Sequence, residues 1–337
     1  MPSIMPEITN GIIIMSRVRL ARNINGCPFR ITDKSLAKNV VKTVNRALVK
    51  TDTFNLYYME NLTTLVKESM KERHLVSENL IKNVECGAVL INQDESLSIM
   101  INEEDVIREQ CFMKGLRLEE AYKRLDVIDD ELSKYLDIAF DKDLGYLTAC
   151  PTNLGTGLRA SVMMFLPALT ESGKITQLVE EVERLGLTIR GVYGEGSKAE
   201  GYMYQISNEV TLGASEYEIL NTVRNAVEEI CLAERKEIEK IYLKKEITTM
   251  DRARKSYGIL TNALLLEYNE FLEHIARVKI GAMLGMININ EIDKIDDLIV
   301  NVRPASLCES YGKKLSSIDR DLVRAERVAH QLKKLKE

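Results

Sequence analysis

The sequence predicts an α+β fold, with a largely antiparallel sheet flanked by helices and a small all-helical domain after it. Over the first two thirds of the 337 residues, short runs rich in β-branched residues alternate with longer runs of helical periodicity. The segment Gln93–Ser96 separates two such β-rich runs and indicates a hairpin, whose strands are antiparallel. After Ser215 the pattern is almost purely helical. We therefore expect one domain over residues 1–245 and a second over residues 246–337.

The individual elements follow from periodicity and from the residues that bound them. We expect strands, bounded by Gly, Asn or Asp, at residues 11–15, 87–91, 97–101, 146–150, 187–193 and 202–206. We expect helices at residues 35–50, 62–73, 103–115, 118–140, 175–185, 217–245, 252–273, just before Gly285, and at 315–335. Asn102 is expected to cap the helix at 103–115, because acidic residues follow it in the first turn. Glu104 would then be kept ionised by the helix N-terminus, and Glu103 and Asp105 would only stabilise the helix.

Composition excludes several classes of function. The net charge of −5 gives no overall basic field that would attract nucleic acid or an anionic membrane. The six cysteines form no CxxC pair, which argues against a zinc site and a disulfide framework and fits a reducing cytosol. No apolar run approaches the roughly 18 residues that a membrane span requires. We expect a cytoplasmic protein without a protein-built metal site.

The sequence also limits the catalytic chemistry. Only three histidines are present, so a hydrolase that pairs a nucleophile with histidine is disfavoured. The sequence contains neither a GxxxxGK[ST] loop nor a GxGxxG turn followed by a helix. If the chain binds ATP, side chains must hold the phosphates.

Arginine side chains are the candidates for that role. Arg17 and Arg19 are two apart on an expected strand, so both point to one face. Two guanidiniums on one face repel each other unless an anion lies between them, although a solvated strand face is the simpler interpretation of this pair alone. Further along, the stretch 144–163 sets Cys150, a glycine-rich turn and Arg159 at fixed spacing between two apolar segments.

This stretch resembles the signature of the ATP:guanido phosphotransferases, the family that includes creatine and arginine kinases. The segments 12–23, 99–108, 188–197 and 205–208 resemble other motifs of that family, in the same order and spacing. The resemblance implies a guanido-kinase catalytic domain. It also implies that Glu104 is the catalytic carboxylate, that Glu195 is a second carboxylate in a glycine-rich loop, and that Cys150 lies beside the guanidine substrate.

The same resemblance implies an ATP site with Mg²⁺ bridging the phosphates. Its members are Ser16, Arg17, Val18, Arg19, His74, Arg108, Arg159, Ala160, Ser161, Val162, Met163, Arg190, Gly191, Val192, Tyr193, Gly194 and Glu195. Converging arginines would neutralise the γ-phosphoryl group during its transfer. A guanidinium has a pKa above about 12, so a carboxylate must orient it and accept a proton.

Within the family, the resemblance is greatest to the bacterial branch that acts on arginine side chains of proteins. We expect no helical domain before the catalytic one, since about a dozen residues precede the first arginine motif. Tyr193 stands where metabolite kinases have an arginine. Near the C-terminus, Arg320, Asp321, Arg324 and Ala325 match the RDxxRA phosphoarginine-binding motif, although their helical spacing alone also fits a solvated, salt-bridged helix.

These features predict an enzyme that transfers the γ-phosphate of ATP to arginine side chains of proteins, in quality control and stress regulation. The implied partners are protein substrates with exposed arginines, an activator protein, a Clp-type unfoldase-protease and a second copy in a homodimer. Two alternatives stay open: a metabolite guanidino kinase, and a phosphoarginine-binding adaptor with weak catalysis. The adaptor is favoured by Lys198, which stands where many relatives have an acid.

Overall fold

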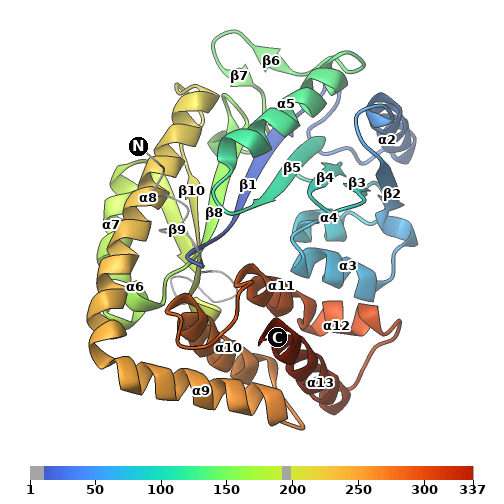
Figure 1. Cartoon of the computed structure of the whole chain (residues 1–337). Helices are drawn as coiled ribbons and strands as arrows, with labels where there is room; N and C mark the ends of the chain where they lie inside the picture. Colours follow the sequence, from blue (N-terminus) through green and yellow to red (C-terminus); the bar gives the residue numbers. More distant parts are fainter. Residues whose placement is uncertain (1–10, 192–198, 337) are drawn as a thin grey trace.

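An eight-stranded sheet forms the centre of the computed structural model, which describes residues 11–191 and 199–336 (Figure 1). The strand order is β2-β3-β4-β5-β1-β8-β10-β9, and each neighbouring pair is antiparallel. The strands are β1 (Ile13–Arg22), β2 (Phe54–Tyr58), β3 (Ala88–Asn92), β4 (Leu97–Ile101), β5 (Ile107–Lys114), β8 (Leu158–Phe165), β9 (Leu187–Gly191) and β10 (Met203–Asn208). A separate small ribbon contains β6 (Phe140–Asp141) and β7 (Gly145–Tyr146). The predicted α+β class and antiparallel sheet are confirmed.

Helices cover one face of the sheet along its whole length. They are α2 (Lys34–Leu48), α5 (Leu118–Ser133), α6 (Pro167–Glu171), α7 (Ile175–Arg184) and α8 (Glu216–Ile241). Their apolar residues join the larger hydrophobic core with alternate residues of the strands, such as Val18 and Val162. The helices α3 (Thr64–Glu72) and α4 (Glu78–Lys82) pack on the other face over β2 to β5, around Met70 and Phe112. On the rest of this second face, over the central strands, the side chains are largely polar.

The C-terminal helices lie against one end of this sheet (Figure 1). They are α9 (Glu246–Asn262), α10 (Tyr268–Met283), α11 (Asp293–Asn301), α12 (Pro304–Ser310) and α13 (Ser317–Lys336). The short helix α12 packs directly on α3 of the sheet region. No helix in the described part of the chain is both long and apolar enough to span a bilayer.

The predicted helix at residues 103–115 is wrong. Residues 107–114 form β5, which pairs with β1 and β4, and Asn102 has a left-handed φ of 59° at the preceding turn. Instead of capping a helix, Asn102 donates a side-chain hydrogen bond to the carbonyl of Cys86. The acidic residues after Asn102 look like the first turn of a helix, but Glu103 and Asp105 accept hydrogen bonds from distant segments, Glu103 from Ser77 and Asp105 from Asn23 and Ala149.

Further differences concern the extent of elements and two strands that the sequence did not indicate. The predicted helix at 252–273 is two helices, because the chain turns between Asn262 and Tyr268. The strand predicted at 146–150 is only the two-residue β7. Strands β2 and β8 were not predicted, and β8 carries Arg159 into the middle of the sheet.

Candidate active site

The register of the sheet gathers arginines on its uncovered central face. Arg17 and Arg19 alternate with buried apolar residues on β1, so both point to the same side. Arg19 is directly paired with Arg159 of β8, and Arg108 of β5 is paired with Ala21, two residues after Arg19 on β1. Directly paired residues of an antiparallel sheet share a face. The predicted convergence of these four side chains is therefore a consequence of strand register.

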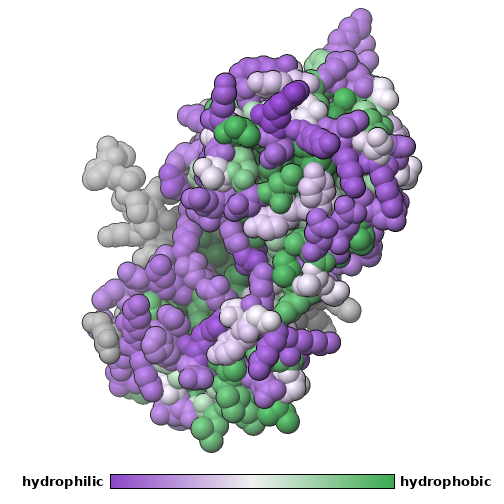
Figure 2. Space-filling model, turned by 90° about the vertical axis from the view of Figure 1, so that its right-hand side faces the viewer, coloured by the Kyte–Doolittle hydropathy of each residue, from purple (hydrophilic) through white to green (hydrophobic). Residues whose placement is uncertain are grey.

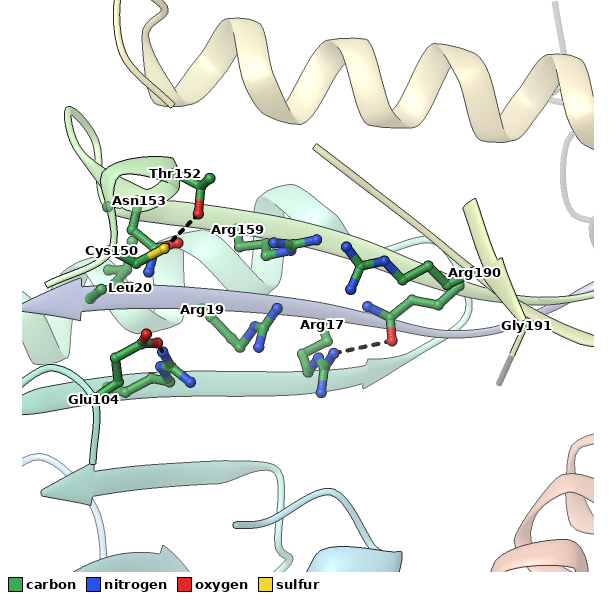
Figure 3. A pocket seen from close by; sticks show the side chains of 14 residues that line it. Arg17, Arg19, Leu20, Glu104, Cys150, Thr152, Asn153, Arg159, Arg190 and Gly191 are labelled. Atoms are coloured by element: carbon green, nitrogen blue, oxygen red, sulfur yellow. Dashed lines mark hydrogen bonds and ion pairs between the residues drawn. The ribbon is translucent and has the colours of Figure 1, made fainter. Parts of the chain in front are cut away.

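These arginines line a cavity of about 450 Å³ (Figure 3). Glu104 and Cys150 face each other at one end of the row, and Arg190 lies toward the other end (Figure 3). The remaining lining residues are Leu20, Ala21, Thr152, Asn153, Gly157, Gly191 and Gln205. One end of the cavity therefore carries a carboxylate and a thiol, and arginine side chains line the rest of it.

The electrostatics of the cavity favour an anion. Burial and then the neighbouring guanidinium of Arg17 lower the pKa of Arg19 well below its ordinary value. Burial and Arg190 lower the pKa of Arg159 in the same direction. The Nε–H groups of Arg19 and Arg159 are buried and have no hydrogen-bond partner among the described residues. Buried charged donors of this kind are costly unless something compensates them, and an anionic ligand would do so.

Glu104 lies in the turn between β4 and β5. Its Oε2 accepts a hydrogen bond of 3.0 Å from Arg108 Nη2, and its side chain is 39% exposed toward the cavity side. The neighbouring Glu103 is buried and pairs with Arg108 Nη1 at 2.8 Å. Arg108 is therefore held between two carboxylates, one buried and one open to a ligand.

Asp105 connects this turn to the loop that carries Cys150. Its Oδ1 accepts hydrogen bonds from Asn23 Nδ2 at 2.8 Å and from the backbone N–H of Ala149 at 2.7 Å. The prediction that Glu103 and Asp105 merely stabilise a helix is wrong: both are buried and fix the positions of catalytic candidates.

The Cys150 loop is held in place by its backbone. The Cys150 Sγ lies 3.0 Å from Thr152 Oγ1, and Pro151 begins a single 3₁₀ turn. The hydroxyl of Thr211 donates toward the carbonyl oxygens of Thr152 and Leu154, at 2.9 and 2.7 Å. Gly155 has a φ of 106°, and a Cβ there would lie 2.3 Å from the Thr211 carbonyl oxygen. Only glycine fits this turn without displacing the backbone.

The other residues predicted at the ATP site divide between the two faces. Ser161 Oγ lies 3.5 Å from Arg17 Nε, on the cavity side. Side chains of four predicted residues are buried on the opposite, helix-covered face: Ser16, Val18, Ala160 and Val162. Five predictions lie outside the described residues, namely those for Val192, Tyr193, Gly194 and Glu195, and for the departure at Lys198.

His74 lines a second cavity of about 530 Å³, together with Met163 and Phe112. A narrow space lined by residues of both cavities, including Arg17 and Gln205, lies between them. The far wall of the second cavity comes from α11 and includes Asp293, Asp296, Asp297 and Asn301. Burial, followed by Arg17 and Arg303, lowers the pKa of His74 to about 3, so its ring is neutral at physiological pH.

The RDxxRA motif lies on α13. Arg324 is 1% exposed, and its guanidinium donates to the carbonyls of Val302 at 3.0 Å and Leu266 at 2.8 Å and to Asp321 Oδ1 at 2.6 Å. Arg320 is half-buried and donates to the Leu315 carbonyl. Ala325 is buried. The structure therefore brings Asp321 and Arg324 together, with the Arg324 guanidinium turned into the protein.

Sequence reasoning missed several residues of the site. Gln205 accepts a hydrogen bond of 3.1 Å from Arg17 Nη2, and Ser207 accepts one of 3.1 Å from Arg159 Nη2. Both lie on β10, two residues apart. The resemblance of residues 205–208 to a family motif was the signal that could have indicated them, and their spacing places both on one face of the strand.

Comparisons with known proteins agree with this geometry. Residues 35–237 match the family model described as ATP:guanido phosphotransferase, C-terminal catalytic domain, and residues 246–337 match that of the protein-arginine kinase McsB C-terminal domain. A protein-arginine kinase of Caldanaerobacter subterraneus subsp. tengcongensis is 40% identical, over 98% of this chain and 99% of its own. One from Clostridium acetobutylicum is 41% identical, over 96% of this chain and 97% of its own.

Two solved structures of guanidino kinases have a similar fold. The duplicated taurocyamine kinase of Schistosoma mansoni superposes with a TM-score of 0.61 and 25% identity, over 76% of this chain. This chain spans 40% of that duplicated enzyme. A lombricine kinase superposes with a TM-score of 0.58 and 27% identity, over 66% of each chain. The chain therefore belongs to the ATP:guanido phosphotransferase family, in its branch of bacterial protein-arginine kinases.

Proposed function

We propose that this protein transfers the γ-phosphoryl group of ATP to the guanidino group of arginine side chains in proteins. The observation that carries the proposal is a cavity in which five arginines and the carboxylate of Glu104 lie together. Relatives 40% identical over nearly the whole chain are named protein-arginine kinases, which supports the same acceptor here.

The part of the cavity that arginine side chains line is proposed to hold the triphosphate. Arg17, Arg19, Arg159 and Arg190 bind the phosphate oxygens, and Arg108 lies nearest the carboxylate end. Guanidiniums make paired hydrogen bonds to phosphate, and fixed donors stabilise the charge of the transferring group without reorganisation. Mg²⁺ would enter with ATP and neutralise part of the charge of the phosphates. This ion keeps several of its water ligands and takes few ligands from the protein, so it needs no site built by the protein alone.

The opposite end of the cavity is proposed to receive the acceptor arginine. Its guanidinium lies between Glu104 and Cys150, which face each other across the site (Figure 3). A guanidino nitrogen attacks the γ-phosphorus, the N–P bond forms, and the bond to the oxygen bridging to the β-phosphate breaks. The nitrogen loses its proton to the Glu104 carboxylate, and ADP leaves. Cys150 and Glu195 are proposed to hold the guanidinium in line.

The second cavity is proposed to hold the nucleoside. It continues from the arginine cavity past Arg17, away from Glu104. Phe112, Met113 and Met163 supply apolar walls, and His74 supplies a neutral ring that suits an uncharged base. This placement sets the phosphates between the nucleoside and the acceptor, as direct transfer requires.

The C-terminal helices are proposed to form a regulatory domain over residues 246–337, after a catalytic domain over 1–245. The RDxxRA motif, Arg320, Asp321, Arg324 and Ala325, is proposed to form a phosphoarginine site there, in which Arg320 and Asp321 contact the ligand and the buried Arg324 holds Asp321 in place. Apolar surface gathers at the lower end of the molecule, where these helices lie (Figure 2). The exposed apolar residues of this part of the chain include Leu264, Leu265, Ile318 and Leu322. Such a patch supports association with a second copy or an activator protein.

The cellular setting is part of the proposal. ATP as substrate and six free cysteines fit the cytoplasm. We propose a role in protein quality control, in which phosphorylated proteins are passed to a Clp-type unfoldase-protease.

A competition between acceptors tests the proposed function. The protein is incubated with ATP and either a folded protein substrate, free arginine or creatine, and phosphate on nitrogen is quantified. Transfer to the protein substrate, lost in Glu104→Ala, supports the proposal. Transfer to free arginine or creatine alone would indicate a metabolite kinase, and phosphoarginine binding without transfer would indicate an adaptor.

A further inference from the structure

The nucleoside cavity is built from two regions far apart in the sequence. One wall contains residues of β1, β5 and β8 together with Arg73 and His74, which follow α3. The other wall contains Asp293, Asp297 and Asn301 of α11. Its shape therefore depends on how the C-terminal helices are docked, and the main docking contact is α12 on α3.

Glu72, the last residue of α3, makes that contact with its carboxylate. Oε1 accepts a hydrogen bond of 3.0 Å from the backbone N–H of Ala305, and Oε2 accepts one of 2.7 Å from that of Ser306. The Ser306 hydroxyl donates a third, of 2.8 Å, to Oε2. These N–H groups belong to the first turn of α12, which begins with Pro304 and has no side-chain cap of its own. Glu72 thus supplies the cap from another element.

The backbone of the same segment is held by α12 as well. Arg303 Nη1, one residue before α12, donates a hydrogen bond of 2.9 Å to the carbonyl of Glu72. Arg73 Nη2 pairs with Glu309 Oε2 on α12 at 3.1 Å, and Arg73 also pairs with Glu95. Glu72 and Arg73, the two residues that precede His74, therefore both contact α12.

His74 adopts a conformation that such ties can maintain. Its φ is 62°, in the left-handed region that a residue with a side chain rarely occupies. Its carbonyl accepts a hydrogen bond of 3.0 Å from Gln110 of β5, and its N–H donates to Lys71. Strained backbone of this kind persists only where the surrounding structure holds it.

We propose that Glu72 is a positioning residue for nucleotide binding. Its carboxylate docks α12 on α3, and the docked helix fixes both His74 and the α11 wall around the nucleoside. This inference rests on the proposed placement of the nucleotide. It makes nucleotide affinity dependent on the C-terminal helices, and by linkage the nucleotide stabilises their docking.

The test compares Glu72→Ala with Glu68→Ala, a matched control one turn earlier on α3. The Glu68 carboxylate pairs with Lys71 of its own helix at 2.6 Å, so its loss leaves the contact with α12 intact. ADP affinity is measured by calorimetry, and kcat and KM for ATP are measured on a protein substrate. Ser306→Ala removes one donor to Glu72 from the other side, and the double variant with Glu72→Ala measures the coupling.

We expect Glu72→Ala to weaken ADP binding by at least about fivefold. It should raise the KM for ATP by a larger factor than it lowers kcat, while Glu68→Ala behaves like the wild type. Ser306→Ala should show a smaller effect in the same direction, with no additional loss in the double variant. In wild type, ADP should slow amide hydrogen exchange in residues 302–310, and this protection should be lost in Glu72→Ala.

Unchanged ADP affinity in both Glu72→Ala and Ser306→Ala would overturn the inference, as would a lower melting temperature with unaltered KM. If Glu72→Ala does not fold, Ser306→Ala alone decides. Arg159→Ala separates this inference from the proposed function. If Arg159→Ala retains ADP affinity, the nucleotide site itself is wrong; if Arg159→Ala loses it and the Glu72 and Ser306 variants do not, only the positioning role fails.

Discussion

Arg19 and Arg159 face each other as a directly paired couple on β1 and β8, each with a buried Nε–H that has no partner within the described residues. Two like charges on directly paired residues of neighbouring strands destabilise the sheet unless an anion lies between them. The folded protein should therefore bind a polyanionic ligand at this position. The nucleotide is proposed to supply the missing partner and should stabilise the fold when it binds.

Arg159→Ala should weaken both ATP affinity and turnover, because a phosphate ligand acts on the ground state and on the transition state. The loss in kcat/KM should be on the order of 10²-fold, as for other single groups that stabilise transition-state charge. Arg184→Ala, in the exposed last turn of α7, is the control. Steady-state kinetics and ADP calorimetry check the prediction, and wild-type affinity in Arg159→Ala would refute the phosphate clamp.

Asp105→Ala should lower kcat while leaving ADP affinity nearly unchanged. The Asp105 carboxylate connects the Glu104 turn to Ala149, next to Cys150, and its hydrogen bonds are to Asn23 and Ala149 and not to an arginine of the cavity. Removing a buried acceptor should also lower the free energy of unfolding by about 1–3 kcal/mol. Kinetics and chemical denaturation are the measurements. An unchanged kcat would mean that the position of the Cys150 loop does not matter for the reaction.

The free energy of unfolding should fall as the pH rises from 4.5 to about 7, because Glu234 ionises in this range. Burial raises its pKa from 4.5 to about 7, despite two backbone N–H donors from α6. The unfolded state releases this proton at lower pH than the folded state, so ionisation across that window favours unfolding. Melting temperatures at both ends of the window should differ less in Glu234→Gln than in the wild type. The exposed Glu229→Gln is the control, and an equal slope in Glu234→Gln would contradict the assignment.

The RDxxRA motif should divide into two roles. Arg324→Ala should lower the free energy of unfolding by about 1–3 kcal/mol, because two backbone carbonyls lose their buried donor. Arg320→Ala should leave stability nearly unchanged and should abolish the response to added phosphoarginine. Thermal melts and phosphoarginine calorimetry measure the two effects. Phosphoarginine binding that survives Arg320→Ala would remove Arg320 from the proposed pocket.

The sequence was sufficient for the α+β class, for the hairpin of β3 and β4, and for the shared side of Arg17 and Arg19, because alternation on a strand fixes which residues share a side. It was insufficient for β5, since the acids after Asn102 look like the start of a helix, and three of their partners, Ser77, Asn23 and Ala149, become neighbours only in the fold. The burial of Arg324 could not be predicted from the sequence either. Its acceptors, Val302 and Leu266, lie 22 and 58 residues away in the chain, and no local pattern connects them.

Mapping of phosphate on arginine tests the central claim most directly. A folded protein substrate is incubated with ATP and either the wild type or Glu104→Gln, and acid-labile phosphate is located by mass spectrometry. We predict phosphoarginine on the substrate with the wild type, and at least about 10²-fold less with Glu104→Gln, which should still bind ADP. Phosphate on serine, threonine or tyrosine instead of arginine, or equal arginine phosphorylation by Glu104→Gln, would contradict the account.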